Sequence, residues 1–183
     1  MIYDFEEFLK KQLIAGGFTM SEAKQMLFAR NLICVCIDDN QNADYQGQLW
    51  HQYSDDPVNF SGIYDMMVTA DELFDAWDFP QRSLERREFV HDDSDDRRHK
   101  GFPTQQDDSD ELTIDRVQKQ QGTRNIQGKR GELGTFIIQV SFRQNATWQG
   151  RVINVEKNER NDFSSAMELV RIIDRDLNTD DSK

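Results

Sequence analysis

The chain has 183 residues, of which 37% are hydrophobic and 31% are charged, so a large enzyme core is not expected. Its formal net charge of -12 repels free nucleic acid and anionic membranes unless the charges are segregated. They are segregated, because residues 1–90 carry 16 acidic and 7 basic residues. No segment approaches the ~18 consecutive apolar residues of a membrane span, and no secretory signal is recognisable. We therefore expect a cytoplasmic protein.

The first third of the sequence predicts helices. Asp4 with Glu7, and Thr19 with Glu22, have the spacing of helix N-terminal capping pairs. The apolar run at residues 31–37 fits a continuing helix or a buried strand, since periodicity does not separate the two, and we favour the helix. The run holds both cysteines, Cys34 and Cys36, which we expect to be buried free thiols.

Two further helices are predicted before residue 80, at residues 43–53 and 58–80. The second has a new start at Thr69 with Glu72, and Pro80 ends it. Large apolar side chains in this region are expected to pack inside an acidic helical domain spanning residues 1–89. They are Trp50, Tyr53, Tyr64, Met67, Leu73, Phe74 and Trp77.

Residues 90–132 read as a charged flexible linker, because they contain too few large apolar side chains to offset the entropy of ordering. The acidic clusters in this stretch lack the frame of a calcium loop, so no metal site is predicted. Basic residues gather near its end, at Arg124, Lys129 and Arg130.

Residues 133–179 predict a small module of a β-hairpin and a helix (ββα), which makes the expected fold class α+β. Alternation over residues 135–143 places Arg143 outside, together with Gln139 and Ser141. Gly150 in the returning strand indicates a bulge or a close backbone approach. The inward face is expected to contain Phe136, Ile138, Val140 and Phe142. The final helix is predicted to begin at Ser165, with Glu168 completing the cap and Ile173 on its apolar face.

No cofactor, metal site, small-molecule substrate or catalytic group is predicted, since no phosphate loop, nucleophile motif or paired Cys/His spacing occurs. The candidate site is a partner-binding surface at the hairpin tip, with arginines, amides and a stacking ring. Its residues are Arg143, Gln144, Asn145, Trp148, Gln149 and Arg151, joined by Arg124, Lys129 and Arg130. We expect that replacing Arg143 and Arg151 together leaves the fold intact. The alternative is that Trp148 packs under the helix and the arginines are ordinary solvated surface.

The segment GTFIIQVSFRQNATWQGRVINVEKNERNDFSSAMELVRIIDRDL resembles a C-terminal module of small proteins from phages, plasmids and conjugative elements of Gram-positive bacteria. Among such proteins are anti-CRISPR inhibitors of type II-A Cas9, including one associated with trimming of the single guide RNA. The resemblance rests on Gly134-Thr135-Phe136, Arg143-Gln144-Asn145, Trp148-Gln149-Gly150 and the helix of residues 165–177. Asn154 and Val155 stand where the similar proteins have an aromatic residue.

The resemblance implies a protein that binds Cas9 or its guide RNA complex, inhibits it and promotes truncation of the guide RNA. Any RNA trimming would then depend on Cas9, and the acidic front half would dock on a basic Cas9 surface by imitating phosphates. Two alternatives stay open. The chain is a mobile-element adaptor or regulator that binds a host protein, or it is a small ribonuclease. Oligomeric state is not determined by the sequence.

Overall fold

The computed structural model describes residues 29–40, 44–83, 112–144 and 147–178. The predicted helix starts at Asp4 and Thr19, residues 90–111 of the predicted linker, and Asn145 lie outside these ranges. The strands are β1 (Leu32–Asp39), β2 (Gln46–His51), β3 (Val58–Ser61), β4 (Arg82–Ser83), β5 (Gly134–Gln144), β6 (Thr147–Asn154) and β7 (Glu159–Phe163). The helices are α3 (Ile63–Ala76), α4 (Thr113–Gln121) and α5 (Ala166–Asn178).

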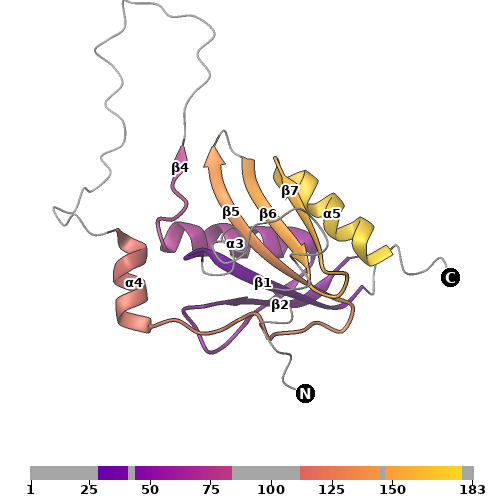
Figure 1. Cartoon of the computed structure of the whole chain (residues 1–183), viewed down its shortest axis with the longest axis horizontal. Coiled ribbons are helices and arrows are strands. Elements are labelled where there is room, and N and C mark those ends of the chain that lie inside the picture. The colour runs from indigo at the N-terminus through magenta and orange to yellow at the C-terminus, as the bar shows by residue number, and fades with distance from the viewer. Residues whose placement is uncertain (1–28, 41–43, 84–111, 145–146, 179–183) are drawn as a thin grey trace, which may run out of the picture.

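One sheet runs through the described part of the chain, in the order β3-β2-β1-β5-β6-β7 (Figure 1). Neighbouring strands on this path are antiparallel, and short β4 pairs with β5 in parallel. The expected α+β class is confirmed. The strands do not keep to the predicted division of the chain, because β1, from the predicted helical domain, pairs along β5, from the predicted ββα module.

The helix predicted through residues 31–37 is wrong, because residues 32–37 lie in the central strand β1. All six are at most 3% exposed, with Val35 in the core on one face of the sheet and Cys34 in the cluster on the other. A strand that is buried on both faces has a continuous apolar sequence and no alternation. The helix predicted at residues 43–53 is also wrong, since β2 occupies residues 46–51.

Helix α3 forms within the predicted segment, but as one uninterrupted helix over residues 63–76 with no new start at Thr69. Asp44 caps its first turn, accepting a hydrogen bond from the Ile63 amide at 2.9 Å. Its buried stripe of Met66, Ala70 and Phe74 faces the sheet. The helix ends before Pro80, as predicted.

The C-terminal segment forms the hairpin of β5 and β6 and the helix α5. Ser165 Oγ accepts a hydrogen bond from the Glu168 amide at 3.1 Å, which confirms the predicted cap. Glu168 in turn accepts one from the Ser164 amide at 2.8 Å. The structure adds a third strand, β7, within the polar segment that was expected to be a loop. Ile173, on the apolar face of α5, is fully buried, as predicted.

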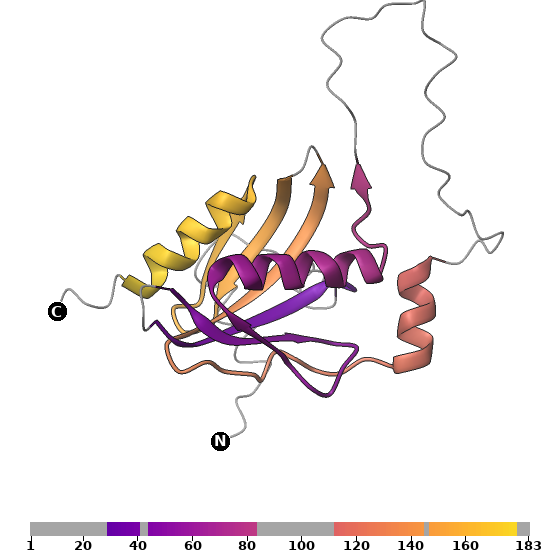
Figure 2. The same cartoon turned by 180° about the vertical axis from the view of Figure 1, so that it is seen from behind.

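Helices α3 and α5 cover the same face of the sheet, which we call the front face (Figure 2). The main core lies between these helices and the strands. Its fully buried large side chains include Ile33, Leu49, Met66, Phe74, Phe136, Ile138, Leu169 and Ile173. Ile114 of α4 also joins this core, so residues 113–121 are not part of a solvated linker.

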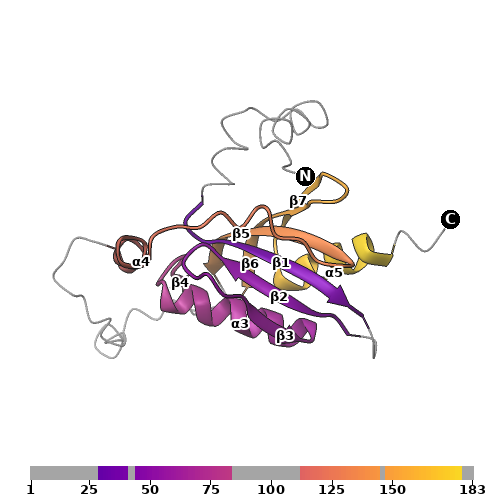
Figure 3. The same cartoon turned by 90° about the horizontal axis from the view of Figure 1, so that it is seen from below.

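The opposite, back face carries a smaller apolar cluster formed by Leu32, Cys34, Cys36, Ile126, Ile137 and Ile153. Ile126 belongs to residues 122–133, here called the strap, which runs from α4 to the start of β5 (Figure 3). Backbone hydrogen bonds fix both ends of the strap, from Arg124 to the Gln52 carbonyl and from Leu133 to the Ile37 carbonyl, each at 2.8 Å. The strap was predicted as linker, but it packs on the sheet.

A register shift in β5 changes which side chains reach the core. The pairing of β5 with β6 is irregular between Val140 and Phe142. Beyond this bulge Phe142 is 54% exposed, and Arg143 is only 4% exposed. The predicted inward position of Phe142 and outward position of Arg143 are therefore wrong, because the extra residue reverses the alternation. The close approach predicted at Gly150 is confirmed, since a Cβ there would overlap the Gln139 carbonyl oxygen.

Candidate functional site

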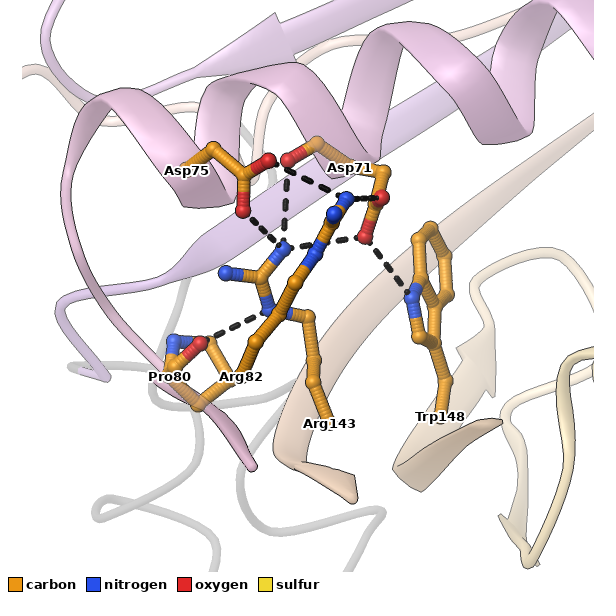
Figure 4. Close-up of polar contacts among 6 residues, drawn as sticks. All are labelled: Asp71, Asp75, Pro80, Arg82, Arg143 and Trp148. Atoms are coloured by element: carbon orange, nitrogen blue, oxygen red, sulfur yellow. Dashed lines mark hydrogen bonds and ion pairs between the residues drawn. The ribbon is translucent and has the colours of Figure 1, made fainter. Parts of the chain in front are cut away.

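Arg143 is the centre of a polar network between the hairpin and helix α3 (Figure 4). Its Nε donates to the Pro80 carbonyl at 2.7 Å, and its Nη1 donates to Asp71 Oδ1 at 2.9 Å. The same Nη1 lies 2.7 Å from Asp75 Oδ1, and the side chain is 3% exposed. A buried guanidinium requires such partners, because leaving it unpaired away from water costs several kcal/mol, on the order of 3–5.

Trp148 completes this network. It is 7% exposed, packs edge-on against Phe74 at a centroid distance of 5.5 Å, and donates from Nε1 to Asp71 Oδ1 at 3.2 Å. Arg82 pairs with the same two aspartates, with Nη2 3.0 Å from Asp75 Oδ2. The expectation that Arg143 and Trp148 project outward is wrong. Both side chains fasten the hairpin to α3.

Two sequence signals could have revealed this network. Gly150 indicated a bulge in the hairpin, and a bulge reverses the facing of every residue beyond it. Asp71 and Asp75 are spaced i,i+4 on one helix without a basic residue in that helix, so they require positive partners from elsewhere in the chain. Neither signal identifies Arg143 as the partner, because 72 residues separate it from Asp71.

The remaining hairpin residues form a patch on the back face, in which Phe142 is exposed and Gln139, Gln149 and Arg151 are half-buried. Phe142 lies opposite Gln149, and Gln139 lies opposite Arg151 in the pairing of β5 with β6. We call these four residues the aromatic–amide patch. Arg151 Nε is 3.4 Å from Asp162 Oδ1 on β7, and its side chain is 36% exposed. Gln149 and Arg151 of the predicted partner-binding surface therefore lie on the same face. The exposed aromatic residue beside them is Phe142 and not the predicted Trp148.

The three predicted basic residues near residue 130 lie on the strap and not at the hairpin tip. Arg124 makes a two-pronged contact with Asp55, at 2.8 Å and 2.7 Å, and this hydrogen-bonded pairing lowers the pKa of the Asp55 carboxyl. Lys129 Nζ lies 3.5 Å from the ring centroid of Trp50. Arg130 donates to the carbonyl of Gln127. Their shared location is the back face, alongside β2.

The outer side of α3 was missed by sequence reasoning. Tyr64, expected to pack in the core, is 79% exposed. Asp65 and Glu72 are also exposed on this helix, which contains four acidic residues and no basic residue. We call Tyr64, Asp65, Val68 and Glu72 the acidic face of α3. Its signal in the sequence was the absence of any positive charge over residues 63–76.

The two cysteines are buried and free, as predicted, with their Sγ atoms 3.9 Å apart. Their mutual hydrogen bond, together with burial, raises the pKa of the Cys34 thiol, while the same bond lowers the pKa of Cys36. No cluster of three or more His, Cys, Asp or Glu residues suited to holding a metal occurs within the described ranges.

Comparison with known proteins adds no relative. No protein-family model, curated protein or solved structure matches this chain significantly. Among the helices that the structure describes, none is long and apolar enough to cross a membrane.

Proposed function

We propose that the chain is a non-catalytic binding protein that docks the acidic face of α3 onto a basic surface of a protein partner. The observation that carries the proposal is Tyr64, a large aromatic side chain that is 79% exposed on a helix with four acidic residues and no basic one. Exposed tyrosines are frequent binding hot spots, since they bury a large area at a small entropic cost.

Charge supports the same surface. Residues 44–83 contain eight acidic residues and one basic residue, Arg82. Arg82 and the buried Arg143 are both directed to Asp71 and Asp75, so they balance only the carboxylates on the inner side of the helix. The exposed carboxylates of Asp65 and Glu72 would steer α3 toward a positively charged partner.

The partner class comes from the resemblance of residues 134–177 to proteins of Gram-positive mobile elements. On that basis we propose a type II-A Cas9 loaded with guide RNA as the partner, and anti-CRISPR inhibition as the function. Nucleic-acid enzymes of this kind hold their substrates in positively charged channels. Surface carboxylates that occupy such a channel would exclude DNA. Shortening of the guide RNA is proposed as a consequence of binding, carried out only in the presence of Cas9.

The test combines a pull-down with guide-loaded Cas9 and a DNA cleavage assay. We expect the wild-type chain to bind and inhibit, and we expect Tyr64→Ala and Glu72→Lys each to weaken inhibition at least about fivefold. Met167→Ala is the matched control, because Met167 is a 62% exposed apolar side chain on α5, outside the acidic face of α3. Equal inhibition by Tyr64→Ala, Glu72→Lys and the control would exclude this face.

Following the guide RNA in the same reactions separates the rival functions. Inhibition with an intact guide supports a simple blocker, and trimming that requires Cas9 supports the full proposal. Trimming without Cas9 would identify a ribonuclease. If the chain neither binds nor inhibits Cas9, the result would favour a mobile-element adaptor that binds another host protein.

A further inference from the structure

We propose that the aromatic–amide patch on the back face binds single-stranded RNA. This proposal is independent of the proposed function, since it concerns the face opposite α3. Its first support is Phe142, which is 54% exposed on the back face, directly after the bulge in β5. An aromatic ring held on a sheet is a stacking platform for an unpaired base, and every base offers a face to stack on.

The geometry surrounds this ring with polar groups suited to a nucleotide. Gln149 lies directly across from Phe142, and Arg151 is two residues further along β6, opposite Gln139. Residues two apart on one strand face the same side about 7 Å from each other. A base stacked on Phe142 would thus lie within reach of the Gln149 amide, and the following phosphate or base within reach of the Arg151 guanidinium.

The platform is held rigidly. Strand β5 pairs with β6 across Phe142, and Arg143 next to it is anchored to Asp71 and Pro80 on the front face. Because the side chain of Arg143 is fixed inward, Phe142 is committed to the back face. A preorganised ring binds a base at a lower entropic cost than a mobile one.

Charge is the third support. Although the whole chain is acidic, the strap carries three basic residues and one acidic residue. Its Ile126 joins the back-face cluster with Ile137 and Ile153, the row of the sheet next to Gln139 and Arg151. The acidic face of α3 lies on the other side of the sheet. Arg151 and Arg124 are partly balanced by Asp162 and Asp55, but the strap still has more basic than acidic residues, so a polyanion meets less repulsion here than at the acidic face of α3.

The amides favour RNA over DNA. The side-chain amides of Gln139 and Gln149 each have an N–H donor and an oxygen acceptor. A ribose 2′-hydroxyl can accept a hydrogen bond from the N–H or donate one to the oxygen, and deoxyribose has no such group. The unpaired form is required, because the bases of a duplex are stacked on each other and cannot lie on Phe142. The ligand is thus single-stranded RNA, read mainly by stacking and by its sugar.

The test measures fluorescence anisotropy of a labelled single-stranded RNA of mixed A and U sequence, titrated with the full chain in the absence of other proteins. We expect Phe142→Ala to weaken binding at least about fivefold, the lower end of what one base–aromatic stack contributes, and Phe142→Trp to retain it. We expect Arg151→Ala to reduce the slope of log affinity against log salt by about 0.7, the value for one lost phosphate contact on a single strand.

Two controls keep this result separate from the proposed function. Tyr64→Ala should bind the RNA like wild type, and Phe142→Ala should bind guide-loaded Cas9 through α3 like wild type. The proposal is overturned if wild type does not bind the RNA, or if Phe142→Ala binds it unchanged while circular dichroism shows both proteins folded. Equal affinity for single-stranded DNA of the same sequence would overturn the assignment to RNA.

Discussion

Asp71 on helix α3 and Arg143 on strand β5 form a 2.9 Å ion pair across 72 residues of chain. The pair joins the first half of the sequence to the hairpin at a point where the guanidinium is almost completely buried. It also decides which hairpin residues face solvent, because Arg143 and Trp148 turn to the front and Phe142 and Gln149 to the back. The contact therefore accompanies the bulge in β5 that leaves Phe142 on the exposed back face.

Arg143→Ala should destabilise the protein by about 3 kcal/mol, because it removes the buried cation that joins the hairpin to Asp71 and Asp75 and leaves the buried Pro80 carbonyl without its donor. Arg143→Lys should recover only part of this loss in stability, since one ammonium group cannot reproduce the several coplanar N–H donors of a guanidinium. Urea unfolding monitored by tryptophan fluorescence measures both. Arg151→Ala is the control and should change stability by less than about 1 kcal/mol, because its pair with Asp162 is partly exposed. An Arg143→Ala protein as stable as Arg151→Ala would contradict the network.

Ile173→Ala should cost about 2–4 kcal/mol, since it opens a cavity between α5 and the sheet at a residue with no exposed surface. Phe142→Ala removes a larger side chain but should cost less than about 1 kcal/mol, because that ring is more than half exposed. Chemical denaturation of the two variants tests the bulge directly. If β5 alternated regularly through residue 143, the order of the two effects would be reversed.

The thiols of Cys34 and Cys36 should react with a thiol reagent only after unfolding, because both are at most 1% exposed in the back-face cluster. The reaction is followed with Ellman's reagent, in native buffer and in concentrated guanidinium chloride. We expect no fast release of product from the folded protein and two equivalents from the unfolded one. Rapid labelling of one thiol in the native protein would show that the back face opens readily.

Stability should fall as the pH is lowered below about 6.5, in part through His51. Burial, with a smaller contribution from Arg124, lowers the pKa of this imidazole in the folded state. The unfolded chain then binds a proton at a pH where the folded chain does not, so the free energy of unfolding decreases between the usual pKa of 6.5 and the lower folded value.

His51→Asn provides the matched variant, because its side-chain oxygen can accept the Tyr53 amide hydrogen bond that His51 Nδ1 accepts at 3.2 Å. Urea unfolding at about pH 7.5 and about pH 5.5 should show a smaller loss of stability in the variant than in wild type. The same loss in both proteins would place the pH dependence in other groups.

Local sequence signals determined the elements that depend on nearby residues. Ser165 and Glu168 predicted the start of α5, the alternation of residues 136–140 predicted the inward face of β5, and Gly150 predicted the close backbone approach. These succeed because caps, strand faces and bulges are satisfied by neighbours within a few residues or by one adjacent strand.

Tertiary structure decided the rest. Residues 32–37 form a strand whose two faces are both covered by other parts of the chain. An all-apolar run has no periodicity that would distinguish such a strand from a buried helix. Arg143 is buried only because Asp71 and Asp75 meet it there, which no local pattern encodes. A charged side chain is buried only where partners compensate for its lost hydration, and here those partners are distant in the sequence. Whether Phe142 or Trp148 is the exposed aromatic residue of the hairpin is therefore decided by the tertiary structure.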